Sequence, residues 1–312
     1  MDTVPRGGRE RPVPGVVGDD GVPLDVTIRG AQGPTVVFCH GFTADSQMWS
    51  PQVEALAGHA RIVTWDQRGH GRSGWGEPSH ATIDQTGRDL AAVLDAVAPS
   101  SPAVLVGHSM GGMSILALAR QRPEWFGTRV VGAFLVTTSA GDLVRRGPLG
   151  LAHEAARKLG LLPALFAGAR VAAPVADALP WRDSWIGRWT LRRLPFTDDA
   201  TEAEVRAVQA RSERLPLAVG QAFGAGLLEH DESATLPVLA RIPVVVVTAD
   251  SDRLTPASHG RRITEAIGPS ARLVEVPHAA HAVTLTHHDV VDEALLDLVL
   301  EIRPRPVGAR GA

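Results

Sequence analysis

The feature that most constrains the fold of this chain is the pentapeptide Gly-His-Ser-Met-Gly at residues 107–111, which has the form G-x-S-x-G. It directly follows the apolar run Ala103–Val106 and leads into a helical pattern over Met110–Arg120. A serine in so sharp a strand-to-helix turn needs small residues on both sides. The turn exposes the hydroxyl at a helix N-terminus, where developing negative charge is favoured. In this context the pentapeptide predicts that Ser109 is a nucleophile. For the same pentapeptide in isolation, a chance match in a glycine-rich chain is an alternative explanation.

Strand and helix patterns alternate on both sides of this motif. Runs of β-branched and apolar residues, typical of strands buried on both faces, are separated by amphipathic helical patterns. This alternation implies βαβ units and a mostly parallel sheet. A Gly-Asp-Asp-Gly turn within Val16–Gly30 predicts a β-hairpin before the first strand of these units. The predicted strands are 35–39, 61–65, 103–106, 130–136, 244–248 and 272–276, and the predicted helices are 46–56, 83–97, 110–120, 257–267 and 288–300.

The alternation breaks in the middle of the chain, where only helical patterns occur. A helical block inserted between two halves of a parallel sheet is expected to form a lid over a catalytic body. Within it, Trp181, Trp185 and Trp189 recur on one helical face, which fits either a lipophilic acyl pocket or packing of the lid on itself and the body. The predicted domains are a catalytic domain at 14–138 and 237–303, a lid at 139–236, and flexible tails at 1–13 and 304–312.

A serine hydroxyl is a weak nucleophile unless a base takes its proton and an acid orients that base. Twelve histidines compete for the role of base. His281 stands out because it follows the predicted strand 272–276 and precedes the last predicted helix. Three nearby histidines are alternatives, each also explained as a solvated residue of a loop or helix start: His278, His287 and His288.

The acid has two candidates. Asp250 and Asp252 both lie just past the end of the predicted strand 244–248. Either carboxylate would give the chain order Ser, Asp, His that this type of fold uses. Either could instead only stabilise a turn.

Hydrolysis also needs N–H donors for the oxyanion, each worth roughly 3 kcal/mol. One is expected to be the backbone N–H of Met110, the residue after the nucleophile. The other should come from the loop after an earlier strand, where His40, Gly41 and Phe42 stand. Phe42 is the candidate for the second N–H, and His40 is expected to hydrogen-bond within this loop rather than act as the base.

Five segments together resemble the α/β-hydrolase superfamily: His40-Gly41, residues 66–73 (Asp-Gln-Arg-Gly-His-Gly-Arg-Ser), residues 107–112, residues 249–252 and His281. The resemblance is greatest to its bacterial esterase, peroxidase-like and C–C hydrolase branch, and it covers about Gly15 to Ile302 apart from the lid. It implies an α/β fold with a mostly parallel eight-stranded sheet, helices on both faces and an inserted helical lid. The resemblance favours Asp252 as the acid and His281 as the base.

The chain departs from the pattern of this superfamily at several positions. Alanine replaces the usual glycine at Ala249 and Ala280, and Thr286 stands where a glutamate is frequent. Epoxide hydrolases and haloalkane dehalogenases of this fold resemble each other in carrying aspartate at the elbow, where this chain has Ser109. An epoxide hydrolase is also expected to have proline at position 43, which is Thr43 here.

Composition narrows the range of partners. The net charge of −3 comes from interspersed charges, which does not indicate a nucleic acid or an anionic membrane. The single cysteine, Cys39, excludes an internal disulfide and fits a reducing compartment. The N-terminal residues lack the apolar core of a signal peptide, and no apolar run reaches the ~20 residues of a membrane span. We expect a cytoplasmic monomer or homodimer that acts on a small lipophilic molecule.

The leading hypothesis is a serine hydrolase that cleaves a carboxylic ester through an acyl-enzyme, with Ser109, His281 and Asp252 as its triad. The same triad would support C–C bond hydrolysis, acyl transfer or cofactor-free perhydrolysis. A non-catalytic ligand-binding receptor on the same scaffold is the alternative from another class. The histidines lack the H-x-x-x-H or H-E-x-x-H spacing of a helical metal site, so we expect neither a metal nor another cofactor.

Overall fold

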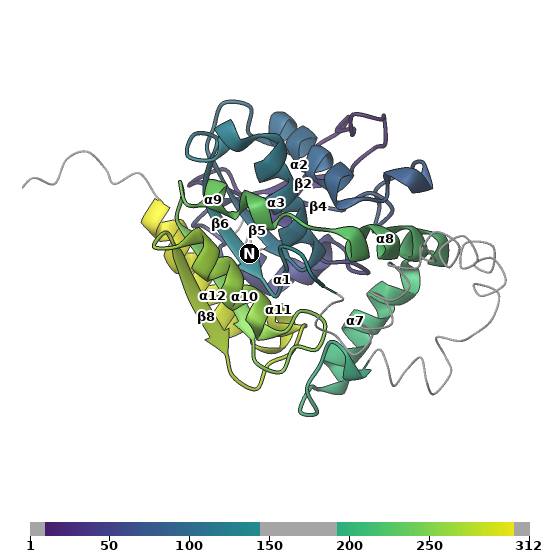
Figure 1. The fold of residues 1–312 in the computed structure, drawn as a ribbon. Helices are drawn as coiled ribbons and strands as arrows, with labels where there is room; N and C mark the ends of the chain where they lie inside the picture. The colour runs from purple at the N-terminus through teal and green to yellow at the C-terminus, as the bar shows by residue number, and fades with distance from the viewer. Residues whose placement is uncertain (1–9, 144–191, 303–312) are drawn as a thin grey trace, which may run out of the picture.

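The protein is built on a single eight-stranded sheet with the order β1-β2-β4-β3-β5-β6-β7-β8 (Figure 1). The structure, a computed structural model, describes residues 10–143 and 192–302. β2 pairs antiparallel with β1 and β4, and all other neighbours are parallel. The predicted mostly parallel eight-stranded sheet is therefore confirmed. The strands are β1 Arg11–Pro12, β2 Val26–Arg29, β3 Thr35–Cys39, β4 Arg61–Trp65, β5 Ala103–His108, β6 Val130–Val136, β7 Val244–Ala249 and β8 Ala271–Val276.

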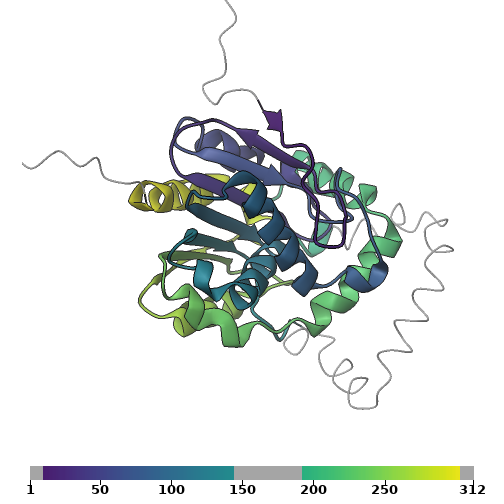
Figure 2. The same cartoon turned by 90° about the horizontal axis from the view of Figure 1, so that it is seen from above.

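Helices cover both faces of this sheet (Figure 2). Apolar residues of α2, α3, α9 and α10 form one buried cluster with the sheet, and those of α1 and α12 form a second cluster. α7 and α8 lie in the chain between β6 and β7. The helices are α1 Ser50–Ala55, α2 Ile83–Val97, α3 Met110–Gln121, α7 Glu202–Arg214, α8 Leu217–Glu229, α9 Leu236–Leu239, α10 Ala257–Ile267, α11 Val283–Thr286 and α12 His288–Ile302.

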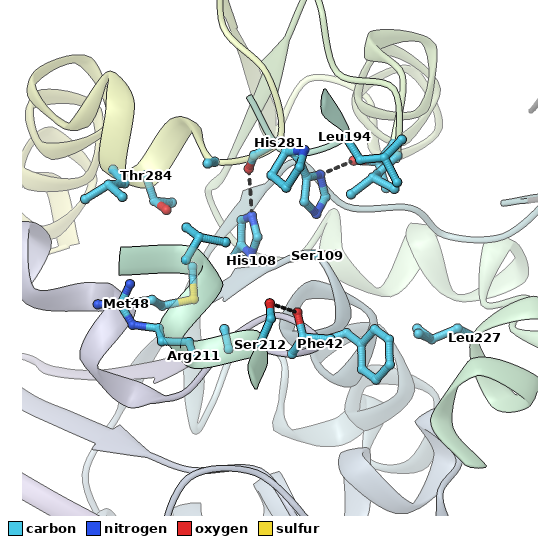
Figure 3. Close-up of a pocket in the computed structure, with 18 of the residues that line it drawn as sticks. Phe42, Met48, His108, Ser109, Leu194, Arg211, Ser212, Leu227, His281 and Thr284 are labelled. Carbon is cyan, nitrogen blue, oxygen red and sulfur yellow. Dashed lines mark hydrogen bonds between the residues drawn. The ribbon is translucent and has the colours of Figure 1, made fainter. Parts of the chain in front are cut away.

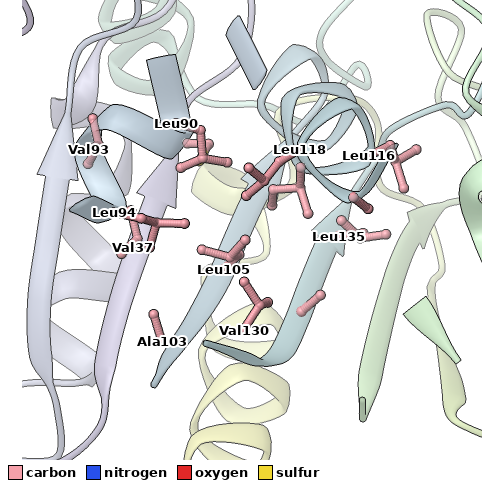
Figure 4. Close-up of a cluster of buried hydrophobic side chains, with 14 of the residues drawn as sticks. Val37, Leu90, Val93, Leu94, Ala103, Leu105, Leu116, Leu118, Val130 and Leu135 are labelled. Atoms are coloured by element: carbon pink, nitrogen blue, oxygen red, sulfur yellow. The ribbon is translucent and has the colours of Figure 1, made fainter. Parts of the chain in front are cut away.

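The central strands supply side chains to both clusters, which is why they are apolar along their whole length. In β3, Val37 belongs to the cluster under α2 and α3, whereas Val36 and Phe38 belong to the one under α12. Figure 4 shows the first cluster, in which Leu90 and Leu118 from the two helices meet the sheet. Each fully buried side chain of this kind contributes about 1.5–3 kcal/mol to folding.

The predicted helix 46–56 is two elements rather than one. Ser46–Trp49 forms a 3₁₀-helical turn whose start is capped by Asp45, and α1 then begins at Ser50. Pro51 stands in the first turn of α1, where its missing N–H costs no hydrogen bond. The proline therefore starts a new helix instead of continuing the turn before it.

The predicted hairpin at 16–30 has the expected turn but little strand pairing beside it. Gly18 donates its N–H to the carbonyl of Val22 at 2.8 Å, and a single bridge joins Val17 to Pro23. The regular pairing lies farther out, where Arg11 and Pro12 of β1 face β2. β1 thus lies inside the stretch 1–13 for which a flexible tail was predicted.

The region predicted to be a lid is described at 139–143 and 192–236. There the chain forms α7, which begins with a capping box of Thr201 and Glu204, and α8. None of the described helices has the length and hydrophobicity to span a bilayer. The tryptophans singled out from the sequence, Trp181, Trp185 and Trp189, lie outside the described residues.

A buried arginine joins the hairpin turn and α2 to the loop after β4. The Arg68 side chain is 1% exposed and donates from Nε and Nη2 to the two carboxylate oxygens of Asp89, at 2.6 and 2.7 Å. Its Nη1 donates to Asp20 at 2.7 Å. Two parallel bonds to one carboxylate fix the orientation of both partners. This contact holds the 66–73 segment against the body of the fold.

Replacing Arg68 with methionine is expected to lower the free energy of unfolding by about 3–5 kcal/mol, because Asp89 would keep a buried charge without its partner. Urea unfolding followed by circular dichroism measures the change. The double variant Arg68→Met/Asp89→Leu should recover most of the loss, since both charges of this fully buried pair are then removed. A single variant as stable as the wild type would show that the ion pair does not hold this loop.

Candidate active site

Ser109 lies in a strained turn between β5 and α3. Its backbone has φ 50° and ψ −117°, a left-handed conformation that costs energy in a residue other than glycine. A Cβ on Gly111 would lie 2.0 Å from the carbonyl oxygen of Cys39, and one on Gly107 would lie 2.6 Å from the Gly112 nitrogen. Both flanking positions therefore require glycine, and the serine is the side chain that the turn presents.

His281 and Asp252 form a hydrogen-bonded pair beside this turn. Nδ1 of His281 lies 2.8 Å from Oδ2 of Asp252, whose side chain is fully buried. The other carboxylate oxygen accepts the backbone N–H groups of Leu254 and Thr255 at 2.8 and 3.0 Å. Burial would raise the pKa of the Asp252 carboxyl, but His281 and the Thr255 hydrogen bonds together hold it below its ordinary value. The carboxylate is thus ionised and orients the imidazole.

The competing acid and bases lie elsewhere. Asp250 is exposed and accepts a hydrogen bond from the hydroxyl of Ser251 at 2.8 Å. His278 is also exposed. The remaining two histidines have other partners: Nδ1 of His287 lies 2.9 Å from the Thr286 hydroxyl, and Nδ1 of His288 lies 3.2 Å from Asp292.

Ser109 and His281 line the same pocket, which has a volume of about 380 Å³ (Figure 3). Side chains of the body and of α7 and α8 enclose it together. Its wall is mostly apolar, and the rest of the lining residues are Phe42, Thr43, Ala44, Met48, His108, Met113, Leu143, Leu194, Pro195, Val208, Arg211, Ser212, Leu227, Leu254, Thr255, Ala282, Thr284 and Leu285.

The two expected oxyanion donors, Phe42 and Met110, lie close to Ser109 in the fold. Met110 is the first residue of α3, and the first N–H groups of a helix have no acceptor within the helix. Phe42 follows Gly41, where an added Cβ would lie 3.4 Å from Cβ of Ser109. Within the described parts of the chain, neither the Phe42 nor the Met110 N–H donates to a protein acceptor. This arrangement suits two N–H groups that bind an oxyanion.

His40 holds this loop in place and does not line the pocket. Its Nδ1 donates to the carbonyl of Gly41 at 2.7 Å, and its Nε2 accepts the Gln67 N–H at 2.9 Å. Burial lowers the pKa of His40, so the ring is neutral and both of its nitrogens are used. His40 therefore does not act as the base.

A comparison with known families finds that the α/β hydrolase fold family matches residues 34–288. This chain belongs to the α/β hydrolase fold family. A pimeloyl-[acyl-carrier protein] methyl ester esterase of Xanthomonas axonopodis pv. citri is 30% identical over 273 residues, which cover 86% of this chain and 96% of that protein.

Solved structures of α/β hydrolases show the same fold. A thermophilic esterase from Thermogutta terrifontis superposes with a TM-score of 0.73 at 22% identity, over 95% of this chain and 100% of that one. An enol-lactonase from Burkholderia xenovorans LB400 gives a TM-score of 0.71 at 22% identity, over 91% and 98% of the two chains.

Two alanines replace glycines that the α/β hydrolase pattern usually has near the acid and the base. Ala249 and Ala280 are both buried, and the bond between His281 and Asp252 forms with both in place. Thr286 stands where the α/β hydrolase pattern frequently has a glutamate, and its hydroxyl donates to the carbonyl of Ala282 at 3.3 Å. These departures from the pattern leave the contact between acid and base intact.

The sequence reasoning missed two side chains that contact the acid–base pair. The hydroxyl of Thr255 lies 2.8 Å from Oδ2 of Asp252 and 3.3 Å from Nδ1 of His281. Nε2 of His108 donates to the backbone carbonyl of His281 at 3.0 Å, with the ring centroids 4.8 Å apart. The sequence signal for Thr255 was only its position three residues after Asp252, and the signal for His108 was only its position directly before Ser109.

We expect Asp252→Asn to slow labelling of Ser109 by a fluorophosphonate at least about a hundredfold, the lower range for loss of base catalysis. An asparagine would no longer hold the Nδ1–H tautomer or stabilise the imidazolium. Intact-protein mass spectrometry follows the labelling. The matched control is Asp250→Asn, which should label at the wild-type rate. Equal slowing in both variants would contradict the choice of Asp252.

Several histidines around the site are buried and neutral. Burial lowers the pKa of His70 and His108 to about 3, and the neighbouring His40 and His281 rings respectively lower it further. Burial lowers the pKa of His230 to about 4. An unfolded histidine takes up a proton near pH 6.5, whereas these folded ones do not. Their contribution to stability is therefore intact above pH 6.5 and is lost as the pH falls from there toward the folded values.

Below pH 6.5, the free energy of unfolding should fall as the pH is lowered, and each such histidine should add about 1.4 kcal/mol per pH unit to this slope. We expect His70→Gln to reduce this slope by one such increment. Urea unfolding at a series of pH values between 7.5 and 5 measures it. His278→Gln, at an exposed position, should keep the wild-type slope. A wild-type slope in His70→Gln would show that His70 is protonated in the folded state.

Proposed function

We propose that this protein hydrolyses carboxylic esters of small to medium lipophilic substrates through an acyl-enzyme on Ser109. The observation that carries the proposal is that Ser109 and His281 face one apolar pocket, with a buried, ionised Asp252 bonded to His281. Membership of the α/β hydrolase fold family supports a hydrolytic reaction.

In the first half of the reaction, Oγ of Ser109 attacks the ester carbonyl carbon and its proton passes to Nε2 of His281. The carbonyl π electrons move to the oxygen, and the N–H groups of Phe42 and Met110 bind the resulting oxyanion. When the tetrahedral intermediate collapses, the C–O bond of the ester breaks. His281 returns the proton to the leaving oxygen, so an alcohol departs and Ser109 carries the acyl group.

In the second half, a water molecule takes the place of the alcohol. It gives one proton to Nε2 of His281 and attacks the acyl carbon, and a second oxyanion forms at the same N–H groups. Collapse breaks the bond to Ser109, whose oxygen takes the proton back from His281. One ester and one water thus give one acid and one alcohol.

The electrostatics around His281 suit this proton transfer. The imidazolium that forms transiently faces the Asp252 carboxylate at 2.8 Å. The nearest ring, His108, is neutral because burial depresses its pKa, so it adds no positive charge beside the imidazolium. The donor bond from His108 to the His281 carbonyl also restrains the backbone of the base.

The pocket supports a lipophilic substrate of limited size. A volume of about 380 Å³ lies at the small end of the range for ligand sites, which starts at roughly 300 Å³. Met48, Met113 and Leu285 are among the side chains that would contact an alkyl or aryl group. Short and medium acyl chains should therefore fit better than long ones.

The test is hydrolysis of p-nitrophenyl esters of increasing acyl length by the wild type and by Ser109→Ala. We expect an optimum at short to medium chains, and a fall in kcat of at least about 10⁴-fold in the variant, since the triad acts as a unit. Ser251→Ala, an exposed serine outside the pocket, is the control and should keep full activity. Folded wild type without ester activity, or activity that survives in Ser109→Ala, would overturn the proposal.

A further inference from the structure

One charged side chain interrupts the apolar wall of the pocket. Arg211, on α7, is the permanently charged residue among those that the structure describes as lining it. Its side chain is 16% exposed. Figure 3 shows it beside Met48, in the part of the wall that α7 forms. Burying a charge is costly unless the charge is well paired. The partners of the Arg211 guanidinium within the protein therefore show whether it has N–H groups left to bind a ligand.

Among the residues that the structure describes, Arg211 makes two hydrogen bonds, and both are long. Nη1 donates to the carbonyl of Ala207 at 3.2 Å and Nη2 to the carbonyl of Gln47 at 3.3 Å. Nε lies 3.4 Å from a carboxylate oxygen of Asp45, and this buried nitrogen makes no hydrogen bond to the described residues. A guanidinium has five N–H donors. Arg211 therefore retains donors for a ligand.

The charge of Arg211 is only partly compensated. Asp45 is shared with Arg214, whose Nη2 lies closer to it, at 2.9 Å. The same carboxylate accepts the Gln47 N–H at 3.1 Å. Burial and the nearby Arg214 together lower the pKa of Arg211 more than the Asp45 carboxylate raises it. This cluster of two guanidinium groups and one carboxylate has an excess of one positive charge, which an anion would offset.

Polar groups connect this cluster to the reacting centre. Ser212, next to Arg211, donates its hydroxyl to that of Thr43 at 3.2 Å, and both residues line the pocket. Thr43 directly follows Phe42, the candidate oxyanion donor. A polar strip thus runs along one wall from the oxyanion loop to Arg211, and the other walls are mostly apolar.

We propose that Arg211 binds a carboxylate of the substrate, so that the enzyme prefers esters that carry a free carboxylate away from the reacting bond. The inference rests on the proposed ester hydrolysis and names its substrate class. A carboxylate matches the planar guanidinium and accepts two of its N–H groups at once. The apolar walls would hold the carbon chain between the ester and the anion.

The test compares matched pairs of substrates. One member is a p-nitrophenyl monoester of a dicarboxylic acid of five to eight carbons, and the other is the same ester with the free acid replaced by a primary amide. A second pair, 4-acetoxybenzoate and 4-acetoxybenzamide, places the charge on the alcohol side instead. For at least one acyl-chain length, or for the pair with the charge on the alcohol side, wild-type kcat/KM should be about tenfold higher for the charged member than for the neutral one. This factor is the lower range for a hydrogen bond to a charged group.

Arg211→Gln should bring this ratio close to one, and Arg211→Lys should retain part of the preference. Because both rates are measured on the same protein, the ratio is insensitive to any loss of stability. Arg206→Gln is the matched control, since it removes the same charge from an exposed position of α7 outside the pocket. It should keep the wild-type ratio.

The two proposals fail in different ways. If the wild type cleaves the neutral esters but prefers no charged one, or if Arg211→Gln keeps the preference, only the carboxylate site is overturned. If the wild type cleaves neither the charged nor the neutral esters, ester hydrolysis is overturned. The carboxylate site is then tested by calorimetric titration of Ser109→Ala with the six-carbon p-nitrophenyl monoester (of adipic acid) and with the corresponding amide. Tighter binding of the charged ligand, lost in Ser109→Ala/Arg211→Gln, supports it; equal binding overturns it.

Discussion

The close contact between the nucleophile turn and the end of β3 is the constraint on which the rest of the site depends. Gly111 lies so near the Cys39 carbonyl that a Cβ there would reach 2.0 Å from its oxygen. This approach joins the N-terminus of α3 to the Phe42 loop. Two N–H groups from segments distant in sequence can then face one oxyanion, and His40 stabilises the arrangement through its bonds to Gly41 and Gln67. The close packing at Gly107 and Gly111 holds the strained backbone of Ser109 in place.

The parallel sheet explains why the remaining groups arrive at the same place. The carboxyl ends of parallel strands meet at one edge, where α/β proteins bind their ligands. β5 ends at the nucleophile, β7 leads to Asp252, and β8 leads to His281. At this edge, contacts with His281 and Thr255 hold the pKa of the Asp252 carboxyl below its ordinary value despite burial, whereas burial lowers the pKa of His108 and keeps that ring neutral. In the proposed mechanism, the imidazolium of His281 therefore faces the Asp252 carboxylate, and the His108 ring adds no positive charge beside it.

Sequence patterns predicted the fold and the sharp turn at Ser109 well because these depend on local structure. Fully buried strands need continuous apolar runs, and a G-x-S-x-G turn needs glycine on both sides. The choice between Asp250 and Asp252 could not come from the same patterns, since both follow β7 by a few residues. It depends on which carboxylate faces inward when the loop after β8 packs against it. Arg211 was missed for the same reason, because an arginine near the end of a helix ordinarily faces solvent and only the fold places it in the pocket.

The proposed reacting groups and the proposed carboxylate site therefore lie in different parts of the chain. The reacting groups come from loops at the edge of the sheet, whereas Arg211 and Ser212 come from α7, in the segment between β6 and β7. Through Asp45 and the Gln47 carbonyl, Arg211 also ties α7 to the loop after β3 that carries Phe42. A carboxylate bound by the remaining donors of Arg211 would thus contact the same side chain that holds α7 against the body. The proposed substrate recognition and the position of this helix are thus linked through one side chain, whereas Ser109, Asp252 and His281 follow strands of the central sheet.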